Sequence, residues 1–131
     1  MSIGLDTSVV LRLLTGEPAV DARLARVRIE RAHAAAEMVL VTDLVLAEAY
    51  FALHYHYGLA KDEARACLRR MADSGIVTIV PPEAVAALDP GGGAGVADRL
   101  IHARHRSVGA ITLTFDKRMS AREGAVRLGR E

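Results

Sequence analysis

Four acidic residues lie in otherwise apolar stretches of this 131-residue chain, where carboxylates are uncommon. They are Asp6 in SIGLDTSVVLRLL, Glu48 in LVLAEAYFAL, Asp98 in GVADRLIHA and Asp116 in AITLTFDKR. Because a carboxylate that loses its hydration is costly without a partner, four such residues favour one shared cluster around a divalent metal. Mg²⁺ and Mn²⁺ prefer carboxylate and water oxygens, and a metal can activate water for attack on phosphorus. The pattern therefore predicts the site of a metal-dependent nuclease.

Each acid also has an ordinary structural interpretation. Asp6 could cap a helix, Asp98 could complement the dipole of a helix N-terminus, and Asp116 could be a turn residue. Glu48 lies on a predicted helix that is apolar nearly all round, so we expect it to be buried and paired, for example with an arginine. These interpretations explain the four positions as independent coincidences, whereas a metal site explains them together.

The elements that must position these acids follow from hydrophobic periodicity and from Gly and Pro breaks. Strands are predicted at 2–6, 38–41, 76–80 and 109–114, with a further edge strand at 125–128, and helices at 7–14, 19–37, 42–57, 59–74, 83–88 and 96–106. Strands separated by helices predict an α/β fold, with a central, mostly parallel sheet of four to five strands flanked by helices. Ligands of such sheets bind at the carboxyl ends of the strands, where Asp6 and Asp116 are expected. The length predicts a single domain over residues 1–131.

Composition and charge narrow the function classes. The net charge is +1, so bulk charge gives no argument for nucleic-acid binding, although four acids sequestered around a metal would leave a basic excess elsewhere. The single Cys67, which we expect in the core, excludes an internal disulfide and a cysteine-rich zinc site. The five histidines have no clear metal-binding spacing beyond His54-x-His56, and we expect them at the surface or at helix ends, with His102 and His105 as candidate RNA contacts. We find no signal peptide and no run long enough to cross a membrane, and expect a soluble, cytoplasmic protein.

Taken in order, the four acidic segments resemble the PIN-domain family, and more narrowly the VapC-type ribonuclease toxins of bacterial and archaeal toxin–antitoxin pairs. LDTSVVLRLLTGE is similar to the family's opening strand and turn, and LVLAEAYFALHYHYGL to the helix that carries the second acid. VADRLIHARHR is similar to the helix of the third acid, and LTFDKRM to the strand end of the fourth. The resemblance covers essentially the whole chain.

The resemblance implies a Rossmann-like sheet with the acids at its carboxyl edge, and cleavage of RNA that depends on Mg²⁺ or Mn²⁺. It implies Asp6 and Asp98 as the principal metal ligands, with Glu48 and Asp116 completing the pocket directly or through water, and Ser8 supporting the site. The implied partners are an RNA substrate, a VapB-like antitoxin and a second copy in a homodimer. Five apolar residues could line the antitoxin groove or belong to the core, namely Leu13, Leu14, Ala52, Leu53 and Tyr57.

Basic residues beside the acidic segments are candidates for holding neighbouring phosphates, or are ordinary surface charges. They are Arg12, Arg104, Lys117 and Arg118. Arg99 departs from the small residue usual in the family, and could point outward, contact RNA or pair with an acid. Gly91–Gly93, before the third-acid helix, is expected to become ordered only on binding of antitoxin or RNA.

Three alternatives remain. The same fold could serve RNA processing or act as a DNA-directed nuclease without being a toxin. It could also be a catalytically silent protein-binding module, whose acids form only ion pairs. A phosphatase on a similar sheet is disfavoured, because Asp6-Thr7-Ser8 lacks the second aspartate of an Asp-x-Asp nucleophile pair. The sequence does not indicate which RNA would be cut.

Overall fold

The computed structural model describes residues 1–129, and strands alternate with helices along nearly all of it. The elements in chain order are β1 (Ser2–Gly4), α1 (Thr7–Thr15), α2 (Ala19–Ala34), β2 (Met38–Thr42), α3 (Asp43–Tyr55), α4 (Lys61–Asp73), β3 (Thr78–Val80), the 3-10 helix η1 (Pro82–Leu88), α5 (Val96–Ser107), β4 (Thr112–Thr114), α6 (Lys117–Ser120) and β5 (Ala125–Arg127). The predicted α/β class, with parallel strands flanked by helices, is confirmed. No helix within these residues is long and apolar enough to cross a membrane.

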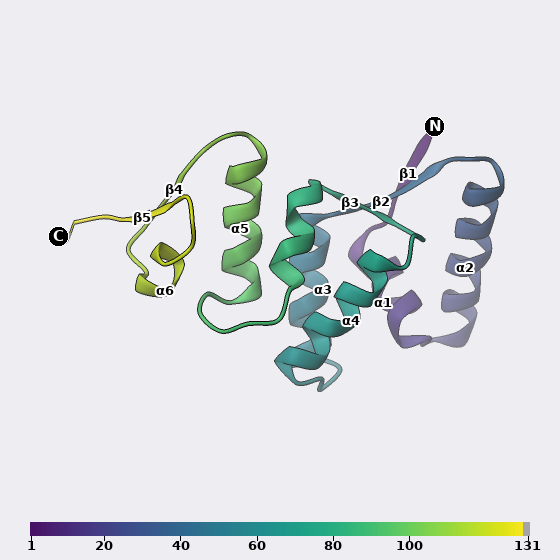
Figure 1. Ribbon diagram of the computed structural model, residues 1–131. Helices are drawn as coiled ribbons and strands as arrows, with labels where there is room; N and C mark the ends of the chain where they lie inside the picture. Colours follow the sequence, from purple (N-terminus) through teal and green to yellow (C-terminus); the bar gives the residue numbers. More distant parts are fainter. Residues whose placement is uncertain (130–131) are drawn as a thin grey trace.

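The five strands form two parallel sheets, whereas the sequence predicted one sheet of four to five strands. β1, β2 and β3 pair in that order, with Ile3 opposite Val39 and Val41 opposite Ile79. β4 pairs with β5 alone. Figure 1 shows α2 at one end of the molecule and the segment β4–α6–β5 at the other, beyond α5. The sheet is divided because β4 is attached to α5, as described below, and not to β1.

The core lies around the three-stranded sheet. β2 alternates exposed and buried residues, as expected for a strand with one face against helices. Its inward side chains Val39 and Val41, with Ile79 of β3, pack in one cluster with apolar residues of the helices. The fully buried large side chains of that cluster are Val10 of α1, Leu46 and Leu53 of α3, Leu68 of α4 and Leu88 of η1.

Local sequence signals set the ends of the helices that carry the acids. α1 ends at Gly16, whose positive φ of 72° closes the helix in the left-handed region that glycine tolerates. Thr42 caps α3 by accepting a hydrogen bond from the Val45 amide at 3.4 Å. Gly16 therefore fixes where α1 ends and Thr42 where α3 begins, and Glu48 follows in the second turn of α3.

Candidate functional site

Asp6 lies at the carboxyl end of β1 and caps α1. Its Oδ1 accepts a hydrogen bond from the Ser8 amide at 2.7 Å and from Ser8 Oγ at 3.1 Å. The carboxylate is exposed to solvent. The local geometry is therefore that of a helix cap, and Ser8 holds the carboxylate in place while it remains accessible.

Glu48 is exposed on α3, and the expectation that it is buried and paired with an arginine is wrong. Its Oε1 accepts a hydrogen bond from Thr7 Oγ1 at 3.0 Å. Leu44, Phe51 and Tyr55 share its helical stripe and are also exposed, although they line cavities between α3 and α5. The partner of Glu48 is therefore the hydroxyl next to Asp6, which brings the first two acidic segments together.

Asp98 lies in the first turn of α5 and is half-buried. It lines a small pocket of about 280 Å³ with aromatic residues of α3, among them Tyr50 and Phe51. Ala47 and Ala97 line a neighbouring cavity of the same helix pair. Glu48 follows Ala47 in the chain and Asp98 follows Ala97, so both acids lie on helices that pack together. No described hydrogen bond or ion pair joins their carboxylates.

Asp116 follows β4 as Asp6 follows β1. It caps α6, and its Oδ1 accepts hydrogen bonds from the Arg118 amide at 2.7 Å and the Met119 amide at 3.3 Å. It is exposed, and it lies on the segment that α5 separates from the three-stranded sheet (Figure 1). The fourth acid is therefore presented like the first, but in a different sheet.

The structure does not gather the four carboxylates around one point. Over residues 1–129, no three side chains of His, Cys, Asp or Glu are close enough together to hold a metal ion. Asp6 and Glu48 are neighbours through Thr7, Asp98 faces another part of α3, and Asp116 is remote. The oxygen donors suit Mg²⁺ chemically, but their arrangement in one chain does not fit a bound divalent ion.

Two of the four candidate phosphate-binding cations are engaged by aspartates. Arg104 forms two hydrogen bonds with Asp43, Nε to Oδ2 at 2.8 Å and Nη2 to Oδ1 at 2.6 Å. Arg12 Nε lies 3.5 Å from Asp21 Oδ2. Lys117 and Arg118 are exposed beside Asp116 and form no ion pair with any described residue.

The pair between Asp43 and Arg104 joins α3 to α5. Asp43 is only 7% exposed, and the hydrogen bond from Arg104 lowers its pKa although burial opposes the shift. The same bond raises the pKa of Arg104, which is half-exposed. A forked guanidinium on a buried carboxylate has the geometry of a structural ion pair.

Arg99 is buried, and it neither points outward nor pairs with an acid, contrary to the alternatives drawn from the sequence. It donates hydrogen bonds to four backbone carbonyls of the preceding glycine-rich loop. Nε bonds Ala94 O at 2.8 Å, Nη1 bonds Asp89 O at 2.7 Å, and Nη2 bonds Gly91 O at 2.7 Å and Gly92 O at 3.1 Å. Arg99 therefore satisfies the carbonyls of Gly91 and Gly92, and the expectation that Gly91–Gly93 orders only on binding of antitoxin or RNA stays a prediction.

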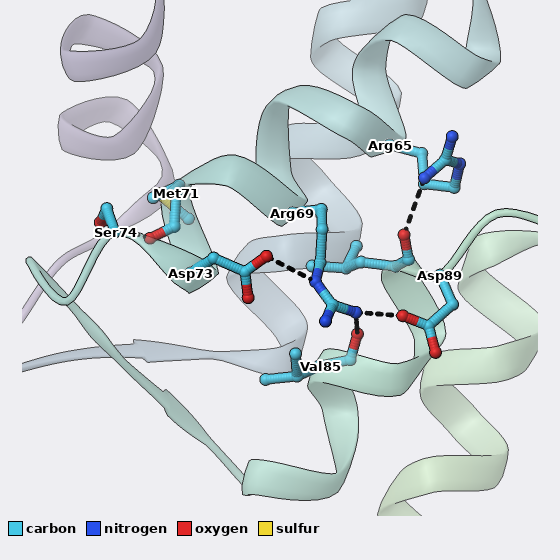
Figure 2. Close-up of polar contacts among 8 residues, drawn as sticks. Arg65, Arg69, Met71, Asp73, Ser74, Val85 and Asp89 are labelled. Carbon is cyan, nitrogen blue, oxygen red and sulfur yellow. Dashed lines mark hydrogen bonds and ion pairs between the residues drawn. The ribbon is translucent and has the colours of Figure 1, made fainter.

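The start of this loop is also fixed to α4. Figure 2 shows Arg69 between Asp73 and Asp89, with a further bond to the Val85 carbonyl. Arg65 donates a hydrogen bond to the carbonyl of Leu88. The Arg65 bond measures 2.9 Å. Arginines from α4 and α5 thus hold the loop from both sides, and in doing so they set the position of Asp98 at the start of α5.

A histidine cluster that sequence reasoning assigned to the surface attaches β4 to α5. The buried Thr112 Oγ1 lies 2.6 Å from His102 Nδ1 and 2.8 Å from His105 Nδ1. His102 Nε2 lies 2.8 Å from the Glu123 carbonyl, which can only accept, so Nε2 carries a proton. In neutral His102, Nδ1 then accepts from the Thr112 hydroxyl, and that hydroxyl accepts from His105. The spacing of the two histidines on one face of α5 was the available signal.

Comparison with known families identifies the fold. Residues 3–124 match the model of the PIN domain, which covers most of the chain. The chain therefore belongs to the PIN-domain family, whose members are generally metal-dependent nucleases. No curated protein and no solved structure gives a significant match. The PIN-domain part of the sequence resemblance is confirmed, and the narrower VapC-type assignment remains a prediction.

Proposed function

We propose that this chain is an endoribonuclease that requires Mg²⁺ or Mn²⁺ and acts as the toxin of a toxin–antitoxin pair. The observation that carries the proposal is the coupling of Asp6 and Glu48 in a PIN-domain chain. Ser8 holds the first carboxylate and Thr7 holds the second, both acids are exposed, and Asp6 lies at the carboxyl end of β1. Ligands of parallel sheets bind at that end.

In the proposed site Asp6 and Asp98 are the principal metal ligands, and Glu48 and Asp116 complete the acidic pocket. All four supply oxygen donors, the type that Mg²⁺ and Mn²⁺ prefer. Exposed carboxylates of this kind can also orient water or accept its proton. Metal binding at these four acids is itself proposed. Within residues 1–129 of one chain, the four carboxylates do not come together.

Lys117 and Arg118 are the cations best placed to hold RNA phosphates. Both are exposed, they are the two residues after Asp116, and neither forms an ion pair with a described residue. Arg12 is a weaker candidate because it is 3.5 Å from Asp21, and Arg104 because its fork is occupied by Asp43. Phosphate contacts of this type give affinity without sequence specificity.

An apolar groove supports the proposed antitoxin partner. A cavity of about 520 Å³ is lined by Leu13 and Leu14 of α1, Ile29 of α2 and Met71 of α4, together with polar residues that include Arg26, Glu30 and Arg70. Two of the five residues predicted for such a groove therefore line one. Leu53 is buried in the core, which is the alternative expected for it.

The substrate test uses RNA and DNA strands of the same sequence, incubated with purified protein and Mg²⁺ or Mn²⁺. We expect cleavage of RNA and not of DNA, and we expect added antitoxin to stop it. Growth arrest on expression of the chain alone, relieved by the gene beside it, tests the toxin role. Cleavage of DNA, or activity without effect on growth, would favour the alternative of a nuclease that is not a toxin. A folded chain that cuts neither strand would favour the silent protein-binding module.

A further inference from the structure

β1 has an unpaired edge. The Leu5 amide donates to Leu40 O at 2.9 Å, so Leu5 and, by alternation, Ile3 point their backbone groups toward β2. The N–H and C=O of Gly4 therefore point to the opposite side, where no described strand pairs. An edge of this kind is a template for another strand.

A groove accompanies this edge. Three consecutive residues of the β1 segment, Ile3 to Leu5, line a cavity of about 510 Å³ together with Val9 of α1 and the exposed Leu24 of α2. The cavity combines unpaired backbone groups with apolar side chains, and Arg28 and the ion pair of Arg12 with Asp21 also line it. A strand with apolar side chains fits both features.

β4 has the complementary edge. The Thr112 amide donates to Gly124 O at 2.9 Å, and Thr114 O accepts from the Leu128 amide at 2.8 Å, so both threonines face β5. Leu113 therefore points its backbone groups outward. Around it, apolar side chains are open to solvent: Ile111 is 61% exposed, Leu113 57% and Phe115 76%.

The outer edge of β5 is less suited to pairing. Its Ala125 amide is already bonded to Arg122 O at 3.1 Å, and its last residue is Arg127. A charged residue on an edge strand disfavours pairing with another strand. Among the described strands of the small sheet, β4 is thus the one that can extend another sheet.

The two acids at the strand ends match in position. Asp6 lies two residues beyond the last residue of β1, and Asp116 two residues beyond that of β4. Each caps the next helix by accepting from the amide two residues on, at 2.7 Å in both cases. Parallel pairing of Gly4 with Thr114 would place Asp6 opposite Asp116, with their backbones about 5 Å apart.

The chain's own β4 is held away from its own β1. Thr112 binds His102 and His105, which fixes β4 on α5, and Arg104 binds Asp43, which fixes α5 on α3. In Figure 1, β4 lies beyond α5 from the three-stranded sheet. Closure within one chain would require these contacts to break.

We propose that the segment β4–α6–β5 of one copy pairs with β1 of a second copy, so that each acidic site contains Asp6 of one chain and Asp116 of the partner. This inference rests on the proposed nuclease function, because it supplies the carboxylate that one chain lacks at β1. Each copy carries both edges, so two copies can pair reciprocally and satisfy both, as in a two-fold symmetric dimer.

Complementation between inactive variants tests the proposal. D6N and D116N are each expected to be inactive as homodimers. Co-expression with two different affinity tags and purification through both yields the mixed dimer, in which one of two sites has both native aspartates. We expect about half of the wild-type cleavage rate from it. No recovery would overturn the proposal, because a site within one chain is defective in both copies.

The matched control reverses the outcome. In a mixed dimer of wild type with the double variant D6N/D116N, exchanged sites always contain one asparagine, so we expect no cleavage. A site within one chain would instead leave the wild-type copy active at about half the rate. Lack of cleavage by wild type would contradict the proposed function and not the exchange.

Oxidative cross-linking tests the exchange without relying on activity, and so applies even if the wild type does not cleave RNA. In a Cys67→Ser background, one tagged copy carries Gly4→Cys and the other Thr114→Cys. The Gly4 position has no neighbouring atom that a Cβ would meet within 4 Å. Exchange predicts an oxidised cross-link of dimer size, whereas Thr78→Cys in place of Gly4→Cys should give none. Failure of the first pair to cross-link would overturn the proposal.

Discussion

The hydroxyl of Thr7 donates a hydrogen bond to Glu48 Oε1 at 3.0 Å, which joins the start of α1 to the middle of α3. Because Thr7 directly follows Asp6, this bond sets the distance between the first two acidic segments. Ser8, the next residue, holds Asp6 itself. Three consecutive residues thus organise the accessible half of the proposed site.

We expect Thr7→Val to lower RNA cleavage while changing stability little. The variant keeps the shape of the side chain and loses the hydroxyl, and an exposed hydrogen bond of this kind contributes about 1 kcal/mol or less. Cleavage rate and thermal unfolding measured on the same preparation check this. Thr7→Ser, which retains the hydroxyl, is the control and should keep most of the activity. Full activity of Thr7→Val would show that the position of Glu48 does not depend on this bond.

Asp6→Asn and Asp6→Ala should separate the structural role of this residue from its chemical role. Asparagine caps helices about as well as aspartate, so we expect unchanged stability, whereas alanine should cost about 1 kcal/mol. Both should abolish cleavage. The free energy of unfolding in urea measures the first effect, and an RNA assay the second. If Asp6→Asn unfolded the chain, the experiment would not separate the structural role of Asp6 from its chemical role.

The ion pair of Asp43 with Arg104 predicts a defined acid sensitivity. The hydrogen bond from Arg104 lowers the pKa of Asp43 below its ordinary value of 3.8. The stability it provides is therefore fully present above pH 3.8 and is lost as the pH falls through the lower, folded-state pKa. Arg104→Met leaves a buried carboxylate without its partner, and we expect a loss of stability at pH 7.

Urea unfolding between pH 7 and pH 2 measures this contribution. The difference in stability between wild type and Arg104→Met should be constant at neutral pH and shrink in the acid range. Asp43→Asn, which removes the charge but not the shape, should flatten the same limb. An equal difference at every pH would mean that Asp43 does not titrate with the pair.

The clamp formed by Arg99 predicts that Arg99→Lys loosens the glycine-rich loop. An ammonium group cannot reproduce the forked geometry that reaches four carbonyls, and a buried carbonyl left without a donor costs about 1–3 kcal/mol. We expect faster hydrogen exchange and proteolysis at residues 89–95. Arg70→Lys on the exposed face of α4 is the matched control and should have no such effect. Unchanged protection of the loop in Arg99→Lys would show that the α4 arginines suffice.

Much of the fold follows from local patterns in the sequence. The four main strands and all helices except the short α6 were predicted near their observed positions, because alternation, caps and Gly or Pro breaks are local signals. The pairing of β4 with β5 alone was not predicted, because strand order depends on contacts between distant segments. Helical periodicity likewise placed Glu48 on a stripe with Phe51 but did not show that the stripe is exposed.

The candidate site was predicted as a set of residues and not as an arrangement. The acids at the ends of β1 and β4 could be predicted, since carboxyl ends of strands are recognisable. The contact of Arg99 with the loop before α5 could not be predicted. A long side chain has many rotamers, and the rotamer adopted depends on carbonyls that only the folded loop presents.

The central claim, metal-dependent cleavage of RNA at these acids, is tested most directly with a pool of structured RNA and purified protein free of antitoxin. Wild type, Asp6→Asn and Asp98→Asn are assayed with Mg²⁺, with Mn²⁺ and with EDTA. Cleavage by wild type in either metal, its loss in EDTA, and its absence in both folded variants are the predicted result. Cleavage that persists in EDTA or in Asp6→Asn would contradict the account.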